Sequence, residues 1–94
     1  MVIQSFRDSR TERIWQREHV SRISVDLERR AHIKLLILNR AETLNDLRVP
    51  PGNHLEKLSG NRDGQYSIRV NKQWRICFEW GKSGPENVEL TDYH

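Results

Sequence analysis

A helical hydrophobic pattern runs through the first half of the chain. Its apolar residues recur at intervals of four, four and three, the spacing of one helix face: Leu27, Ala31, Leu35 and Leu38. Ile33 and Ile37 are expected to widen this face, and Ser24 is placed to cap the helix. The segment 49–53 (V-P-P-G-N) ends it, because neither a helix nor a central strand accepts that run. The pattern predicts one long amphipathic helix.

After this break the apolar period changes to two, which is typical of strands. Apolar and polar residues alternate over 66–70 and 74–80, and Asn71 and Lys72 between them favour a tight antiparallel hairpin. A turn over 81–85 leads to a last predicted strand over 87–93. At the start of the chain, residues 2–6 are expected to form a short strand and residues 8–16 a short helix.

These elements predict an α+β fold, with an N-terminal strand and two helices packed on one face of a small, mainly antiparallel sheet. The 94 residues favour a single domain that spans residues 1–94. Because the helices would cover the apolar face of the sheet, Arg69 and Arg75 should project from its other face.

Composition argues against several classes of protein. The one cysteine, Cys77, allows no disulfide within the chain and favours a reducing compartment, the cytoplasm. No apolar run approaches the ~20 residues that cross a bilayer, and no signal-peptide pattern is visible. The four histidines have no metal-ligand spacing with the cysteine, and no phosphate-binding glycine motif is present. We therefore expect no membrane association, no metal and no small-molecule cofactor.

Positive charge is concentrated in two parts of the chain. Residues 1–40 carry nine Lys or Arg and five Asp or Glu, and residues 57–75 carry five and one, so each part has a net charge of +4. The remainder has −5, which gives the total of +3. A pair of arginines on one sheet face suits phosphate recognition. An ion-pair network of Arg69 and Arg75 with Glu79 and Glu89 is an equal alternative.

Three short motifs together resemble one family of toxins. They are S-I-R-V-N at 67–71, W-R-I-C-F at 74–78 and D-Y-H at 92–94, and the opening I-Q-S-F and the P-P-G break also agree. The chain resembles HigB-type toxins, the plasmid-maintenance killer branch of the RelE/ParE superfamily of type II toxin–antitoxin systems. The resemblance covers nearly the whole chain. It implies a ribosome-dependent endoribonuclease that cuts mRNA in the 30S decoding site and is neutralised by a cognate HigA-type helix-turn-helix antitoxin.

The resemblance also implies a set of site residues. The residues expected to be catalytic are Arg75, Asp92, Tyr93 and His94. Those expected to bind RNA phosphate are Lys57, Arg62, Arg69 and Lys72. Two positions depart from the family pattern, because Glu56 replaces a histidine and Ser59 replaces a lysine.

Metal-independent RNA cleavage needs a base for the 2′-hydroxyl, an acid for the 5′-oxygen and cations at the phosphate. His94 has the side chain whose ordinary pKa, about 6.5, lies near neutrality, so it would act as acid or base. Asp92 would orient His94 or act beside it, and Tyr93 would stack on a base or hydrogen-bond the phosphate. Arg75, helped by Arg69, would stabilise the developing negative charge.

Two other functions stay open from the sequence alone. A non-catalytic ParE-like toxin, which poisons DNA gyrase by binding, would share the fold and need neither replaced residue. A small RNA-binding adaptor would bind RNA with a steep salt dependence and without toxicity. For the antitoxin, we expect an acidic segment to dock on the basic helix surface around Arg29, Arg30 and Lys34. Wrapping of the helices and covering of the active face are equally open.

Overall fold

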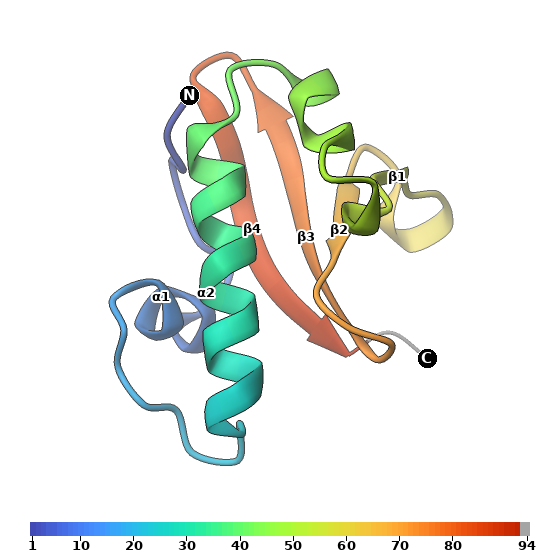
Figure 1. The fold of residues 1–94 in the computed structure, drawn as a ribbon. Helices are drawn as coiled ribbons and strands as arrows, with labels where there is room; N and C mark the ends of the chain where they lie inside the picture. The colour runs from blue at the N-terminus through green and yellow to red at the C-terminus, as the bar shows by residue number, and fades with distance from the viewer. Residues whose placement is uncertain (93–94) are drawn as a thin grey trace.

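Two helices precede a four-stranded antiparallel sheet whose strands lie in chain order, β1-β2-β3-β4 (Figure 1). The structure is a computed structural model and describes residues 1–92. The helices are α1 (Ser9–Trp15) and α2 (Val25–Arg40), and the strands are β1 (Glu56–Lys57), β2 (Tyr66–Arg69), β3 (Trp74–Gly81) and β4 (Gly84–Asp92). Short 3₁₀ turns at Leu44–Arg48, Pro51–Asn53 and Gly60–Arg62 connect them. The predicted α+β class is confirmed, and no helix within the described residues is long and apolar enough to cross a membrane.

Both helices begin where the sequence predicts them. The side chain of Asp8 accepts a hydrogen bond from the Thr11 backbone N–H, and Ser24 accepts one from Leu27, so each helix has an N-cap. The predicted stripe of α2 is buried: Leu27, Ala31, Leu35 and Leu38. Ile33 is 51% exposed, so the prediction that it widens this face is wrong. Ile33 precedes the buried Leu35 by two residues, which is about 200° around an α-helix, so Ile33 points to the opposite side.

The sheet has one apolar and one polar face, as predicted. Ile68 pairs with Ile76, which pairs with Leu90, and all three are buried against the helices. Figure 1 shows both helices on this side of the sheet, with α2 lying along β4 and β3. The pleat directs the intervening residues, Arg69 and Arg75 among them, to the other face.

The predicted N-terminal strand over residues 2–6 is wrong, since the structure reduces it to one isolated parallel bridge between Phe6 and Val88. The segment still runs along the outer edge of β4, where the backbone N–H of Gln4 donates to Pro85 O and that of Arg7 donates to Val88 O. Pro85 has no N–H to offer, and a bulge interrupts β4 shortly after it. A continuous ladder therefore does not form.

The strands of the sheet also differ in detail from the sequence prediction. β4 begins at Gly84 rather than at 87, and the last residue of the predicted strand, Tyr93, lies outside the described residues. Asn87, with φ +52°, forms a bulge with Val88 opposite Phe78. The two-residue strand β1 has no alternating pattern, so the sequence gives no sign of it.

Candidate functional site

The guanidinium of Arg75 is held rigidly on the polar face of the sheet. The residue is 8% exposed. Its Nε donates to Ser67 Oγ at 2.8 Å, and its Nη2 donates to the backbone oxygen of His54 at 2.6 Å. Bonds in two directions fix the plane of the guanidinium before any ligand arrives. Such a preorganised donor suits a phosphate that gains negative charge during reaction.

Two neighbours of Arg75 come from the segment before β2, and sequence reasoning missed both contacts. The short strand β1 pairs Glu56 with Ser67, which places Glu56 Oε1 3.7 Å from Arg75 Nη2. His54 has φ +45° after the 3₁₀ turn, and in this conformation its carbonyl oxygen accepts from Arg75. From the sequence, Glu56 is a departure from the family pattern, and a solvated carboxylate is favoured over a general base at this position. His54 contacts Arg75 through its backbone oxygen, so the type of its side chain gives no sign of this contact in the sequence.

The acidic residues once considered as partners of the arginine pair bond elsewhere. Glu89 Oε1 lies 3.1 Å from Arg62 Nη1, and Glu79 Oε2 accepts from Asn87 Nδ2 at 3.1 Å. The Nε of Arg69 donates to the backbone oxygen of Asn71 at 3.1 Å. The contacts of Glu79 and Glu89 therefore do not form the network that the sequence offered as the alternative to phosphate recognition.

Of the three predicted C-terminal catalytic residues, the structure describes only Asp92. It stands opposite Trp74 at the end of β4, whereas Arg75 stands opposite Thr91, so the pleat directs Asp92 and Arg75 to different faces of the sheet. Asp92 Oδ2 accepts from Gln73 Nε2 at 3.1 Å, next to the β2–β3 hairpin. Tyr93 and His94 lie outside the described residues. The roles of all three stay predictions.

The first two of the predicted phosphate-binding residues lie on different faces of the sheet. Lys57 is exposed on β1 and pairs with Tyr66, so it belongs to the side of the sheet opposite Arg75. Arg62 shares the polar face, where its Nη1 donates to Gln65 Oε1 and Glu89 Oε1. A cation that is hydrogen-bonded to a carboxylate gains less from a phosphate, and Arg62 stands 3.1 Å from Glu89 whereas Arg75 stands 3.7 Å from Glu56, so Arg62 is the weaker candidate.

The other two predicted phosphate-binding residues meet in a basic cleft of about 370 Å³ between α2 and the β2–β3 hairpin. The cleft is lined by Arg30, Lys34, Gly52, His54, Arg69, Val70, Asn71 and Lys72. No carboxylate is among these residues. Because His54 also accepts a hydrogen bond from Arg75, the cleft adjoins the Arg75 site. Arg69 and Lys72 are thus brought together beside Arg75, with two cations from α2 that the sequence did not place there.

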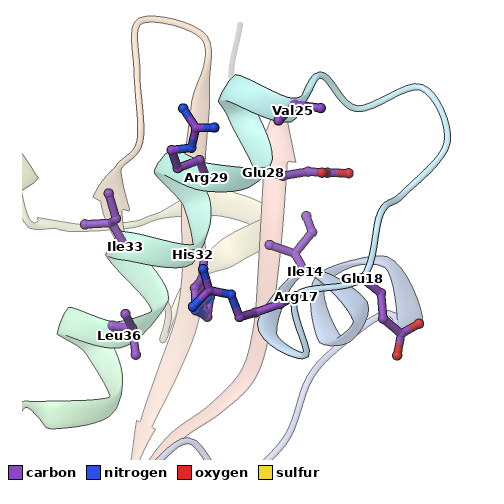
Figure 2. Close-up of a pocket in the computed structure, with 9 residues that line it drawn as sticks. All are labelled: Ile14, Arg17, Glu18, Val25, Glu28, Arg29, His32, Ile33 and Leu36. Carbon is purple, nitrogen blue, oxygen red and sulfur yellow. The ribbon is translucent and has the colours of Figure 1, made fainter.

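A second cavity, a groove of about 260 Å³ between α1 and α2, has a different character (Figure 2). Figure 2 shows apolar side chains of both helices along it, with the guanidinium of Arg17 reaching toward His32. Acidic and basic residues both line it: Arg17, Glu18, Glu28 and Arg29. Mixed charge and an apolar floor do not favour a phosphate, so this groove is not the candidate site.

His32 in this groove makes folding stability sensitive to pH. Burial, and secondly the positive charge of Arg17, lower the pKa of His32 below its ordinary 6.5, and its buried Nδ1 has no hydrogen-bond partner among the described residues. As pH falls below about 6.5, the unfolded chain takes up a proton that the folded one resists, so stability falls. Urea midpoints measured across this pH range are expected to fall less in His32→Gln than in wild type. A pH dependence of the His32→Gln midpoint equal to that of wild type would contradict the assignment.

The remaining polar groups of the described chain offer little further chemistry. Cys77 is buried on the Arg75 face, and burial raises the pKa of its thiol against the weaker effect of a Thr91 hydrogen bond. A protonated buried thiol is a poor nucleophile, so Cys77 acts as a small core residue. Within residues 1–92, no three His, Cys, Asp or Glu side chains gather in a way that could hold a metal ion.

Comparison with known proteins assigns this chain to a family. The family model described as "RelE-like toxin of type II toxin-antitoxin system HigB" matches residues 4–94. Toxin HigB-1 of Vibrio cholerae is 43% identical over 89 residues, which cover 94% of this chain and 90% of the relative. An uncharacterized protein of Haemophilus influenzae is 38% identical over 89 residues, covering 94% and 88%.

A solved structure supports the fold independently. The YoeB–YefM complex from Staphylococcus aureus contains a chain that superposes with a TM-score of 0.62, covering 100% of this chain and 99% of that one. At 18% identity this likeness concerns the fold alone. Together with the family match and the Vibrio relative, it confirms the resemblance found in the motifs. The chain belongs to the HigB-like family of RelE-like toxins of type II toxin–antitoxin systems.

Proposed function

We propose that this toxin is an endoribonuclease that cleaves mRNA in the decoding site of the 30S subunit and so inhibits translation in the cytoplasm. The observation that carries the proposal is the guanidinium of Arg75, buried, fixed by Ser67 and His54, and adjoining a cleft lined with cations. An RNA strand whose scissile phosphate meets Arg75 would have its neighbouring phosphates near those cations. This arrangement suits RNA better than an uncharged substrate.

The proposed reaction needs no group beyond side chains. A base takes the proton of the 2′-hydroxyl, the 2′-oxygen attacks phosphorus, and the bond to the 5′-oxygen breaks as that oxygen accepts a proton. The products are a 2′,3′-cyclic phosphate and a 5′-hydroxyl. Arg75 would stabilise the charge that develops on the phosphate oxygens. His94 is the proposed acid or base, with Asp92 and Tyr93 as its assigned neighbours.

Glu56 is a second candidate for the base. Its carboxylate lies 3.7 Å from Arg75 and its side chain is 53% exposed, so it is accessible to a substrate that Arg75 holds. In the family pattern quoted above a histidine occupies this position. A carboxylate accepts the 2′-hydroxyl proton and would leave His94 to act as the acid.

Primer extension on a defined mRNA held on programmed ribosomes tests the proposal. Wild-type toxin is expected to cut within the decoding site, and His94→Ala should cut about 10²–10⁴-fold more slowly, the usual worth of a positioned proton donor or acceptor. Intact mRNA with a folded, toxic wild type, accompanied by DNA damage signalling, would favour gyrase poisoning. RNA binding without toxicity would favour the adaptor function.

The partner we propose is a cognate antitoxin of the HigA type, with a helix-turn-helix domain. Support comes from the family, which is defined by toxin–antitoxin systems, and from the solved YoeB–YefM complex, whose chain shares this fold. Co-purification of the tagged toxin with the product of the neighbouring gene is expected, and its failure would count against the proposal.

A further inference from the structure

The basic surface that the sequence predicts on α2 is divided by the structure. Arg30 and Lys34 are four residues apart, so they share a helix face, and both line the cleft beside the β2–β3 hairpin. Arg29 lies about 100° around the helix and lines the groove between α1 and α2 instead. The cleft and the groove can therefore bind different ligands.

Lys34 is held in the cleft by an amide, and no carboxylate is among the described residues that line the cleft. Lys34 is half-buried, and its Nζ donates to Asn53 Oδ1 at 2.6 Å. Asn53 is itself fully buried, and its Nδ2 donates to the backbone oxygens of Leu47 and Val49, so the amide cannot turn away. An ammonium has three donors, and Asn53 uses one of them. The position therefore holds a fixed, partly desolvated cation with donors to spare, and such a charge is best stabilised by an anion.

The cleft collects further positive charge from the hairpin. Lys72 is exposed at its rim, and Arg69 lies beside it. Burial lowers the pKa of Lys34, which agrees with a partly desolvated ammonium. Arg30 is exposed and also contacts Asp26 at 3.1 Å, so it contributes less than Lys34.

We propose that the cleft between α2 and the β2–β3 hairpin is a second phosphate-binding subsite, in which Lys34 and Lys72 hold the RNA strand beside the phosphate that Arg75 binds. The inference rests on the proposed function. RNA is favoured over an acidic peptide because the cleft and the Arg75 site are adjacent. His54 lines the cleft, and its carbonyl oxygen accepts a hydrogen bond from Arg75. A strand with phosphates at regular intervals would reach both.

Binding of a short, labelled 2′-O-methyl oligoribonucleotide to the full chain, measured by fluorescence anisotropy at several salt concentrations, tests the proposal. This probe has no free 2′-hydroxyl and is not cleaved. Lys34→Gln and Lys72→Gln are each expected to weaken binding about tenfold at low salt and to reduce the slope of log affinity against log salt by ~0.7. Gln at position 34 keeps an amide donor for Asn53, and Lys34→Arg should restore binding. Arg29→Gln, the same charge change on the other side of α2, is the matched control and should keep the wild-type slope.

Three outcomes would overturn the subsite, and they distinguish its failure from failure of the proposed function. If Lys34→Gln and Lys72→Gln bind the probe as Arg29→Gln does while wild type cleaves mRNA on ribosomes, the subsite is wrong and the proposed function stands. If wild type neither binds the probe nor cleaves, the proposed function fails and the subsite with it. If Lys34→Gln binds RNA normally but loses affinity for the cognate antitoxin, the cleft holds an acidic protein segment and the RNA subsite is overturned.

Discussion

Replacing Arg75 by alanine is expected to slow mRNA cleavage on programmed ribosomes by about 10²–10³-fold, the usual effect of removing one preorganised donor to a developing anion. The fold fixes the orientation of Arg75 through Ser67 Oγ at 2.8 Å and the His54 carbonyl at 2.6 Å. Water molecules and mobile side chains would have to reorganise around the phosphate, so they replace the Arg75 guanidinium poorly. The single-turnover rate at saturating toxin measures the loss directly, and relief of growth arrest during expression should accompany it.

Two further variants separate charge from structure at this position. Arg75→Lys keeps the charge but reaches one acceptor in place of two, so we expect an intermediate rate. Ser67→Ala removes the Nε acceptor and leaves the guanidinium, so we expect a loss of less than about tenfold if the phosphate contact carries the effect. Thermal unfolding of each variant controls for misfolding. A folded Arg75→Ala protein that cleaves at the wild-type rate would refute the assignment.

Phe78→Ala is expected to destabilise the fold by about 3–5 kcal/mol, the largest effect of any single core substitution proposed for this chain. Phe78 is 0% exposed in the centre of β3, between Tyr66 with ring centroids at 6.2 Å and Trp80 at 6.4 Å. Alanine leaves a cavity among fully buried neighbours, and such a cavity adds to the lost transfer free energy of the ring. A small domain has a total stability of only ~5–15 kcal/mol, so a substantial fraction of the variant should be unfolded at 37 °C.

Urea unfolding followed by tryptophan fluorescence measures this loss. Phe78→Leu keeps most of the volume and should lose less than half as much stability. Ile33→Ala, at a residue that is 51% exposed, is a matched surface control and should change stability by less than about 0.5 kcal/mol. A Phe78→Ala midpoint close to that of Ile33→Ala would mean that β3 does not carry the core.

The sequence by itself determined the helices, the hairpin and the two faces of the sheet. The apolar residues from Leu27 to Leu38 follow a 3.6-residue period, and the strands that contain Ile68 and Ile76 follow a period of two. Each period predicts the buried face correctly, because the apolar face of each element is removed from water on folding. The caps Asp8 and Ser24 are likewise local, since each satisfies backbone donors within its own helix. The family motifs are also carried by short segments, and the comparisons confirm the family.

Only the tertiary structure decided which residues surround Arg75 and which cations share a cleft. Glu56 contacts Arg75 because it lies on a two-residue strand that no sequence pattern predicts. The His54 carbonyl oxygen accepts from Arg75 because His54, after the turn at Pro51–Asn53, has a left-handed backbone conformation. Lys34 joins Lys72 across segments nearly forty residues apart in the chain. Such contacts depend on how helix, loop and sheet pack together, whereas periodicity records only which face of one element avoids water.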